Sequence, residues 1–260
     1  MRLDKLLLQR GLAPSRERAQ ALILAGRVLV NQQKLEKAGA AVQDDAAVRI
    51  LGEDMPFVSR GGLKLAHALQ HWRIDVRGQT CLDIGASTGG FTDCLLQNGA
   101  AKVIAVDTGY GQMDARLRAD PRVRLLEKTN ARYLTAAQLW PQPSKAEPIS
   151  FLAIDVSFIS VTLVLPAVIE CVRAGAGSSG FEAVVLVKPQ FEAGREQVGK
   201  GGIVRDPHAQ QAAVERVADA VQRLGGTDLE VIDSPILGAE GNREFLLHAR
   251  FGSQREVAGG

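Results

Sequence analysis

The sequence has few of the residues on which several protein classes depend. Its 260 residues include three cysteines, Cys81, Cys94 and Cys171, and no Cys-x-x-Cys pair. An odd number of cysteines, two of them in apolar runs, argues against a disulfide framework and favours a reduced, cytoplasmic setting. The four histidines are scattered and have no cysteine cluster beside them. The sequence therefore predicts no metal site.

Long apolar segments are missing as well. No stretch approaches the ~18 uninterrupted apolar residues of a membrane-spanning helix. The chain is charged from Arg2 onward and shows no apolar signal core, so we expect a cytoplasmic protein without a membrane span. Apolar residues still make up 46% of the chain and charged residues 23%, as in an ordinary folded protein. The length allows one large domain with a second, small one.

Charge is distributed unevenly along the chain. The net charge is only +2 and decides nothing by itself. Residues 1–50, however, hold nine lysines and arginines against five acidic residues. Such a local excess favours an anionic partner such as RNA, although a solvated basic surface would have the same composition. The residues expected to contact phosphates are Lys5, Arg16 and Arg18, followed by Arg2 and Arg10.

Hydrophobic periodicity divides the chain into two modules. Residues 1–50 combine two short amphipathic helices with short strands, which predicts a small α+β domain. Residues 51–59 are rich in turn formers and predict a linker. Residues 60–251 alternate strands and helices, which predicts a Rossmann-like α/β fold, a mainly parallel sheet with helices on both faces. Residues 252–260 are expected to form a flexible tail.

The second module resolves into individual elements. The expected strands are 80–84, 102–106, 123–126, 150–155, 182–187, 229–233 and 245–251. The expected helices are 61–71, 91–98, 158–172 and 208–224. The composition of 140–148 indicates a loop.

A glycine-rich segment follows the first strand of this module. Residues 81–91 read as a strand, a tight bend and the start of a helix, and the next strand ends at Asp107. This order is typical of α/β sheets that bind an adenosine-containing cofactor, with the later carboxylate near the ribose. Ser87 replaces the second glycine of the dinucleotide motif, and Asp83 would repel a pyrophosphate. The cationic S-adenosylmethionine would tolerate Asp83, so the segment favours methyl transfer.

Four polar residues stand at the ends of apolar strands or in an apolar helix: Lys64, Asp155, Lys188 and Glu244. The carboxyl ends of parallel strands line one ligand crevice, so Asp155 and Lys188 should converge beside the glycine-rich segment. Five apolar residues precede Lys188, which indicates a buried stem, and desolvation favours the neutral amine that acts as a base. A solvated loop end is the alternative. The pattern alone leaves the two interpretations equal.

A second basic segment follows Lys188 in the chain. Residues 199–205 are glycine-rich and include Lys200 and Arg205. This segment could close over substrate phosphates, and a plain surface hairpin is the alternative.

Longer motifs resemble a known family. Residues 3–7, 15–19 and 22–31 look like an S4-like RNA-binding domain. Residues 58–65, 83–93, 106–112, 155–160, 187–192 and 241–245 follow in the order found in the TlyA family. That family comprises bacterial ribosomal-RNA 2′-O-methyltransferases, often labelled hemolysin A, with an FtsJ-type methyltransferase domain. The resemblance covers roughly residues 2–250.

The resemblance implies an activity, a cofactor and roles for the four polar residues. Lys64, Asp155, Lys188 and Glu244 match the family's Lys-Asp-Lys-Glu set. It implies that Lys188 activates a ribose 2′-hydroxyl of a ribosomal cytidine, that Asp155 and Lys64 hold that hydroxyl or a neighbouring phosphate, and that Glu244 orients a lysine. The implied contacts to S-adenosylmethionine are Asp83, Gly85, Ser87, Thr88, Gly89, Phe91 and Asp107, with Asn130 near the adenine. Phe91 is equally compatible with a core position.

Other functions remain open at this level. An RNA-binding or ribosome-assembly protein with an inactive methyltransferase domain would not need all four polar residues. A membrane-active hemolysin would need amphipathic or spanning segments and an export signal. Base methylation would need a motif such as Asn-Pro-Pro-Tyr where residues 187–189 read Val-Lys-Pro. Ribosomal RNA or a ribosomal subunit is the expected partner, and neither a metal nor a protein partner is expected.

Overall fold

The computed structural model describes residues 1–13, 15–50, 55–140, 147–175, 180–238 and 241–252. The chain divides into two compact units, residues 1–55 and 56–260, each treated separately below. The boundary falls within the expected linker. Residues 51–54 of that linker, 253–260 of the expected tail and 141–146 of the expected loop lie outside the described residues.

The first unit is a small α+β domain. Its elements are α1 (Leu3–Gln9), α2 (Arg16–Leu24), β1 (Val28–Val30), β2 (Gln33–Lys34) and β3 (Val48–Ile50). The strands pair antiparallel in the order β2-β1-β3. Ser15 caps α2 by accepting a hydrogen bond from the Arg18 N–H, as its residue type predicts. Leu3, Leu7 and Ile23 are fully buried between the helices and the sheet.

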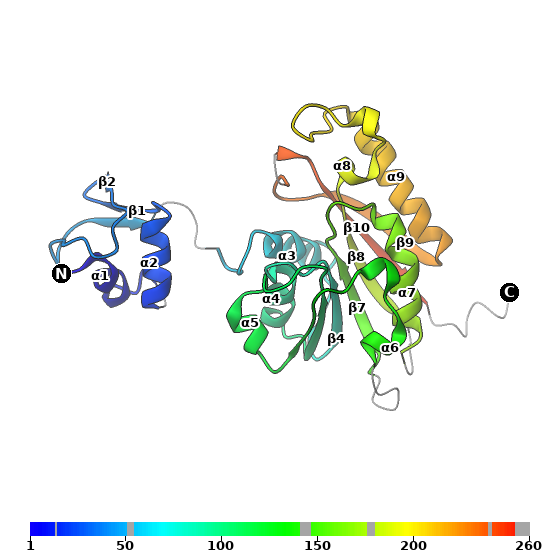
Figure 1. Cartoon of the computed structure of the whole chain (residues 1–260), viewed down its shortest axis with the longest axis horizontal. Coiled ribbons are helices and arrows are strands. Elements are labelled where there is room, and N and C mark those ends of the chain that lie inside the picture. Colours follow the sequence, from blue (N-terminus) through cyan, green and yellow to red (C-terminus); the bar gives the residue numbers. More distant parts are fainter. Residues whose placement is uncertain (14, 51–54, 141–146, 176–179, 239–240, 253–260) are drawn as a thin grey trace. The chain divides into compact units, whose positions relative to one another are not determined.

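The second unit contains a seven-stranded sheet in the order β6-β5-β4-β7-β8-β10-β9 (Figure 1). Its strands are β4 (Thr80–Ile84), β5 (Lys102–Val106), β6 (Val123–Leu126), β7 (Ile149–Ile154), β8 (Phe181–Val187), β9 (Gly226–Asp233) and β10 (Phe245–Phe251). The pairs from β6 to β8 are parallel, whereas β10 runs antiparallel to both β8 and β9. The mainly parallel sheet expected from the sequence is therefore confirmed.

Helices cover both faces of this sheet. They are α3 (Gly61–His71), α4 (Gly90–Gln97), α5 (Ala115–Ala119), α6 (Ala136–Leu139), α7 (Leu165–Arg173), α8 (Pro189–Glu192) and α9 (Pro207–Arg223). Successive strand residues face opposite sides, so Leu82 packs in the apolar cluster with α7 and α9, while Cys81 packs in the cluster with α3 and α4. None of the described helices is long and apolar enough to cross a membrane.

One expected element needs correction. The expected helix 158–172 begins only at Leu165, after a 3₁₀ turn at Val161–Leu163. Phe158 has a φ of 64°, in the left-handed region that an α-helix excludes, so residues 155–160 form a loop at the sheet edge. The strand β10 runs antiparallel to β8, so its first residue lies at the edge where the parallel strands have their carboxyl ends. Phe245 pairs with Val187, which brings Glu244 beside Lys188.

Candidate active site

The glycine-rich bend between β4 and α4 is shaped by close backbone contacts. Gly85 has a φ of 86°, and a Cβ there would lie 2.2 Å from the backbone oxygen of Asp155. Only glycine therefore lets the ends of β4 and β7 approach. Gly89, with a φ of 95°, is the N-cap of α4, and a Cβ there would meet the Leu117 side chain at 2.4 Å. Both glycines are needed for the backbone path itself.

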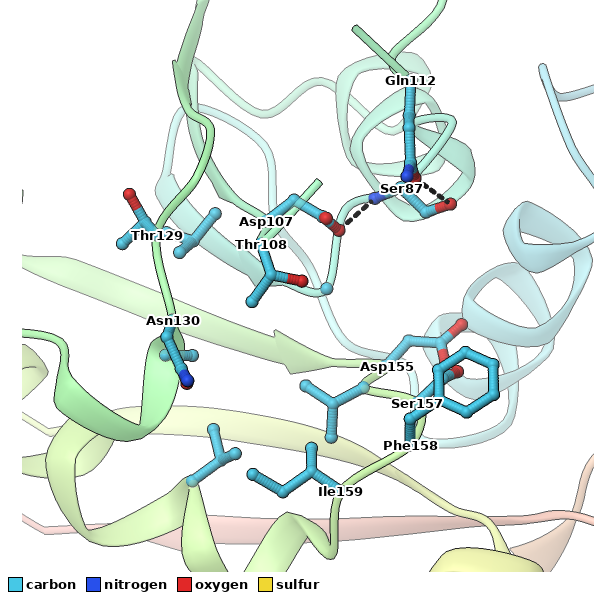
Figure 2. A pocket seen from close by; sticks show the side chains of 15 residues that line it. Ser87, Asp107, Thr108, Gln112, Thr129, Asn130, Asp155, Ser157, Phe158 and Ile159 are labelled. Atoms are coloured by element: carbon cyan, nitrogen blue, oxygen red, sulfur yellow. Dashed lines mark hydrogen bonds between the residues drawn. The ribbon is translucent and has the colours of Figure 1, made fainter. Parts of the chain in front are cut away.

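Asp107 fixes the middle of this bend. Its Oδ2 accepts a hydrogen bond from the Ser87 N–H at 2.8 Å (Figure 2), and its Oδ1 accepts one from the Gly109 N–H at 2.6 Å. Ser87 has a φ of 47°, which a non-glycine residue adopts at an energetic cost. The hydrogen bond that the Ser87 N–H donates to Asp107 offsets part of that cost. A carboxylate has about four lone-pair sites, so Asp107 retains acceptors for a ligand hydroxyl.

A cavity of about 260 Å³ lies beside the bend. Figure 2 shows Asp107, Thr108 and Asn130 from loops after β5 and β6, with Asp155 and Phe158 from the loop after β7. Among the described residues, its lining includes two aspartates and neither lysine nor arginine. Such a lining suits a cationic ligand and disfavours a pyrophosphate.

Asp83 lies beneath the bend and does not line the cavity. Its side chain is fully buried, and Thr92 Oγ1 donates a hydrogen bond to Oδ2 at 2.6 Å. The other oxygen, Oδ1, has no hydrogen-bond partner within the described part of the chain. Burial raises the pKa of the Asp83 carboxyl to about 7, and the neighbouring charges of Asp155 and Asp107 add to the increase.

The remaining candidate cofactor residues occupy different positions. Thr88 and Phe91 line a second cavity, which shares Ser87 and Asp155 with the first. Phe91 is only 3% exposed and packs in the apolar cluster with α3 and α4, so it is a core residue that also lines the cavity. Asn130 is exposed in the first cavity, where its side-chain oxygen caps the 3₁₀ helix Ala131–Tyr133.

The four polar residues form two lysine–carboxylate pairs. Lys188 Nζ lies 2.5 Å from Asp155 Oδ1, and Lys64 Nζ lies 2.5 Å from Glu244 Oε2. Lys64, Lys188 and Glu244 are all at least nine-tenths buried. The convergence of Asp155 and Lys188 and the burial of the Lys188 stem are confirmed. Buried amines held by carboxylates can position a hydroxyl and exchange protons with it.

Each of these side chains reaches the site from a different element. Lys64 lies on α3, Asp155 follows β7, Lys188 follows β8 and Glu244 precedes β10. Lys64, Lys188 and Glu244 line a third cavity, which shares Ser157 and Phe158 with the first cavity and Lys64 with the second. The three cavities therefore meet at the two ion pairs.

The sequence did not single out Ser157, Phe158 and Asn242. Ser157 Oγ accepts a hydrogen bond from Lys188 Nζ at 2.7 Å. Phe158 is 93% exposed and lies 5.4 Å, centroid to centroid, from the ring of Phe191. All three lie within motifs that were quoted only for the family resemblance. No local pattern signals the positive φ of Phe158, which depends on the fold around it.

Asn242 fixes the basic segment 199–205. Its Nδ2 donates to the Gly202 carbonyl at 2.9 Å, and its Oδ1 accepts from the Val204 N–H at 3.0 Å. The segment closes on itself through the Gly199 N–H and the Ile203 carbonyl. Lys200 and Arg205 are exposed on it, and Gly202 lines the third cavity. Asn242 thus anchors the segment 199–205 as a turn at the wall of the third cavity.

In the first unit, several basic side chains have internal partners. Arg2 and Arg16 both donate to the fully buried Asp4, at 2.9–3.2 Å. Arg10 donates to the backbone carbonyls of Asp44 and Ala46. The Arg2 guanidinium, with Gln20 and Arg16, holds the pKa of the Asp4 carboxyl well below its usual range. Lys5 is exposed on α1, and Arg18 is half-buried on α2.

Comparisons with known proteins agree with this geometry. The FtsJ-like methyltransferase family model matches residues 57–251, and the S4 domain model matches residues 1–48. "Putative rRNA methyltransferase YqxC" of Bacillus subtilis is 46% identical to this chain, and the match covers 95% of this chain and 84% of that protein. "16S/23S rRNA (cytidine-2'-O)-methyltransferase TlyA" of Mycobacterium tuberculosis is 43% identical, and the match covers 99% of this chain and 92% of that protein. A solved structure titled "Putative hemolysin from Streptococcus thermophilus" is 42% identical, with a TM-score of 0.72 over 98% of this chain and 89% of that one.

Proposed function

The chain belongs to the FtsJ-like methyltransferase family and carries an S4 domain, and from this premise we propose that it methylates a ribose 2′-hydroxyl of ribosomal RNA, at a cytidine, with S-adenosylmethionine as the methyl donor. The observation that carries the proposal is the pair of buried ion pairs, Lys188–Asp155 and Lys64–Glu244, at the meeting point of three cavities. The relative named for cytidine 2′-O-methylation supports the choice of substrate. Such a substrate belongs to the cytoplasm.

The charges around the glycine-rich bend support S-adenosylmethionine. Asp107 and Asp155 line the first cavity, and beneath it one oxygen of the buried Asp83 has no hydrogen-bond partner in the ranges that the structure describes. A cationic ligand would offset the repulsion among these three carboxyls. Asp107 would hold the ribose hydroxyls and Asn130 the adenine, while Ser87 and Thr88 would line the methionine end. The bound cofactor supplies an electrophilic methyl group and leaves as a neutral thioether.

Lys188 is the proposed base. In the reaction Lys188 must first release to solvent the proton that it holds in the ion pair with Asp155. The 2′ O–H bond then breaks and its proton passes to the amine, while a bond forms between the 2′-oxygen and the methyl carbon as the bond from that carbon to sulfur breaks. Asp155 holds the Lys188 amine at 2.5 Å and stabilises the ammonium that results. Alignment of the 2′-oxygen with the methyl carbon accounts for much of the rate, since the displacement needs an in-line approach.

Lys64 and Glu244 position the nucleotide. The Lys64 ammonium is held by Glu244 and lines both the second and the third cavities. A cation fixed there can bind the 2′-oxygen or the neighbouring phosphate without moving during the reaction. Phe158, 93% exposed at the cavity rim, offers an aromatic face for the base of an unstacked nucleotide.

Contacts to the surrounding RNA would come from basic side chains outside the two ion pairs. Lys200 and Arg205 are exposed on the segment 199–205, which Asn242 anchors at the wall of the third cavity. In the S4 domain, Lys5, Arg16 and Arg18, with Arg2 and Arg10, are the proposed phosphate contacts. Contacts of this kind set affinity and register on the RNA and do not select the sequence.

The decisive experiment uses ribosomal subunits from cells that lack the protein. The purified protein is incubated with methyl-labelled S-adenosylmethionine and each subunit, and the RNA is hydrolysed in alkali. A 2′-O-methyl group blocks cleavage at its own nucleotide, so label is expected in alkali-resistant dinucleotides that contain cytidine. Label confined to mononucleotides would indicate base methylation, and no label with either subunit would also contradict the proposal.

Lys188→Ala tests the assignment of the base. Removal of a general base should lower the rate of methyl transfer by about 10²–10⁴-fold and leave cofactor affinity largely unchanged. Lys102→Ala is the matched control, since Lys102 pairs with Glu147 at the opposite end of the sheet. A Lys188→Ala protein with the unsubstituted rate would show that another group takes the proton.

A further inference from the structure

Ser157 makes a direct contact with the proposed base. Lys188 Nζ donates to Ser157 Oγ at 2.7 Å and lies 2.5 Å from Asp155 Oδ1. Ser157 lines both the first cavity, beside the glycine-rich bend, and the third, which contains Lys64 and Glu244. Its hydroxyl therefore lies where the two cavities meet, next to the amine that takes the proton.

The geometry of an amine limits what these two contacts permit. A neutral lysine amine has two N–H bonds and one lone pair, arranged tetrahedrally with the bond to Cε. Ser157 Oγ accepts one of these N–H bonds, whereas Asp155 Oδ1 makes an ion-pair contact at 2.5 Å and has no hydrogen-bond partner in the described segments of the chain. Ser157 is therefore the group that fixes a direction for the amine, and Asp155 attracts the second N–H by charge. Loss of the Ser157 hydroxyl would let the amine rotate about the Cε–Nζ bond and turn its lone pair away from the substrate.

We propose that Ser157 is a positioning residue that, with Asp155, orients the Lys188 amine so that its lone pair is directed at the ribose 2′-hydroxyl. This inference rests on the proposed function, since it assigns a role in the same proton transfer. Ser157 touches neither the cofactor nor the 2′-oxygen in this scheme. It acts through Lys188.

The loop that carries Ser157 is anchored to the helix that follows Lys188. Glu192, at the end of α8, is 3% exposed. Its Oε2 accepts from Ser160 Oγ at 2.5 Å, and its Oε1 accepts from the Val161 N–H at 2.7 Å. A closed ring therefore runs from Lys188 to Ser157, along the loop to Val161, and back through Glu192. This ring fixes an exposed serine without burying it.

Ser157→Ala tests the proposal with little risk to folding, because Ser157 is exposed. Single-turnover methyl transfer to ribosomal subunits is measured at saturating S-adenosylmethionine, together with the KM for subunits and the calorimetric Kd for the cofactor. A misdirected base should lower the single-turnover rate constant by about 10- to 100-fold, with KM and Kd unchanged. Ser157→Thr keeps the hydroxyl and should restore most of the rate.

Ser150→Ala is the matched control, since Ser150 lies on β7 at the end opposite the site. It should transfer methyl groups at the unsubstituted rate. Equal rates for Ser157→Ala and the unsubstituted protein would overturn the positioning role and leave the proposed function standing. A Ser157→Thr protein as slow as Ser157→Ala would also overturn it. No ribose methylation by the unsubstituted protein would overturn the proposed function, and this inference with it.

Discussion

Within the part of the chain that the structure describes, each unit of this protein buries one aspartate completely, and the two aspartates have opposite surroundings. Asp4 in the first unit accepts hydrogen bonds from Arg2, Arg16 and Gln20. Asp83 in the second unit accepts one side-chain hydrogen bond, from Thr92, and its other oxygen has no partner among the described residues. Two arginines hold the Asp4 pKa well below its usual range, whereas burial raises the Asp83 pKa to about 7.

The comparison shows that burial alone does not assign a role to a carboxylate. Asp4 is neutralised within its own domain, and it fixes two arginines that the S4 domain can present to phosphates. Asp83 lies beneath the glycine-rich bend, where burial and the charges of Asp155 and Asp107 make its charged form costly, and a bound cation would lower that cost. The arrangement around Asp4 stabilises the fold. The arrangement around Asp83 lowers the free energy of unfolding when the carboxyl is charged, and binding of a cationic ligand would offset part of that loss.

Asp83→Asn should produce the largest change in stability. Because the folded pKa is raised from 3.8 to about 7, stability is highest below about pH 4, declines as the pH rises to about 7, and stays low above it. At pH 8 the variant should gain about 4 kcal/mol in free energy of unfolding, at about 1.4 kcal/mol per pH unit. Near pH 4 the two proteins should be equal.

Both tryptophans, Trp72 and Trp140, lie in the second unit, so urea unfolding followed by their fluorescence reports on that unit. Asp219→Asn, an exposed carboxyl on α9, is the control and should show no such dependence on pH. The same Asp83→Asn protein should bind S-adenosylmethionine more weakly. A gain in free energy of unfolding of equal size at pH 4 and pH 8 would contradict the conclusion that the charged Asp83 carboxylate destabilises the fold.

Asp4→Asn should have a smaller effect of the opposite sign. The folded pKa is lowered, so the stability that the carboxylate provides is present above about pH 4 and is lost as the pH falls below it. At pH 7 the variant should lose about 1.5–3 kcal/mol of unfolding free energy, the range for hydrogen bonds to charged groups. Amide hydrogen exchange in residues 1–50 measures the loss, and Asp45→Asn, an exposed carboxyl, is the control. An Asp4→Asn protein more stable than the unsubstituted one at pH 7 would refute the conclusion that the Asp4 carboxylate stabilises the first unit.

Arg16→Gln should have the smallest effect, because Arg2 and Gln20 still hold Asp4. Removal of one phosphate contact should lower the slope of log affinity for ribosomal RNA against log salt by about 1. Filter binding over a salt series measures this slope. Arg77→Gln, whose side chain pairs with Asp75 before β4, is the control and should leave the slope unchanged. An unchanged slope for Arg16→Gln would remove Arg16 from the RNA contacts.

The sequence predicted most of the second unit because its signals are local. Short apolar runs placed β4, β5 and β6 with the bounds observed, and the order of strand, glycine-rich bend and acid placed Asp107 at the first cavity. The helix expected at 158–172 was wrong at its start, since periodicity continues through a loop whose conformation depends on Phe158 and Glu192. The cofactor and RNA contacts remain predictions.

The sequence by itself determined the elements, the chemical groups at the sheet edge and the family. Only the tertiary structure decided which groups meet. Lys64 and Glu244 are 180 residues apart and pair because β10 enters the sheet antiparallel beside β8. Ser157 became the partner of Lys188 through the same sheet order. The pKa shifts of Asp4 and Asp83 have opposite signs, because Asp4 is held by its near neighbour Arg2 and by Gln20 and Arg16 from α2, whereas burial in the second unit raises the pKa of Asp83. Local patterns encode helices and strands, whereas ion pairs and pKa values depend on long-range packing, which a local pattern does not specify.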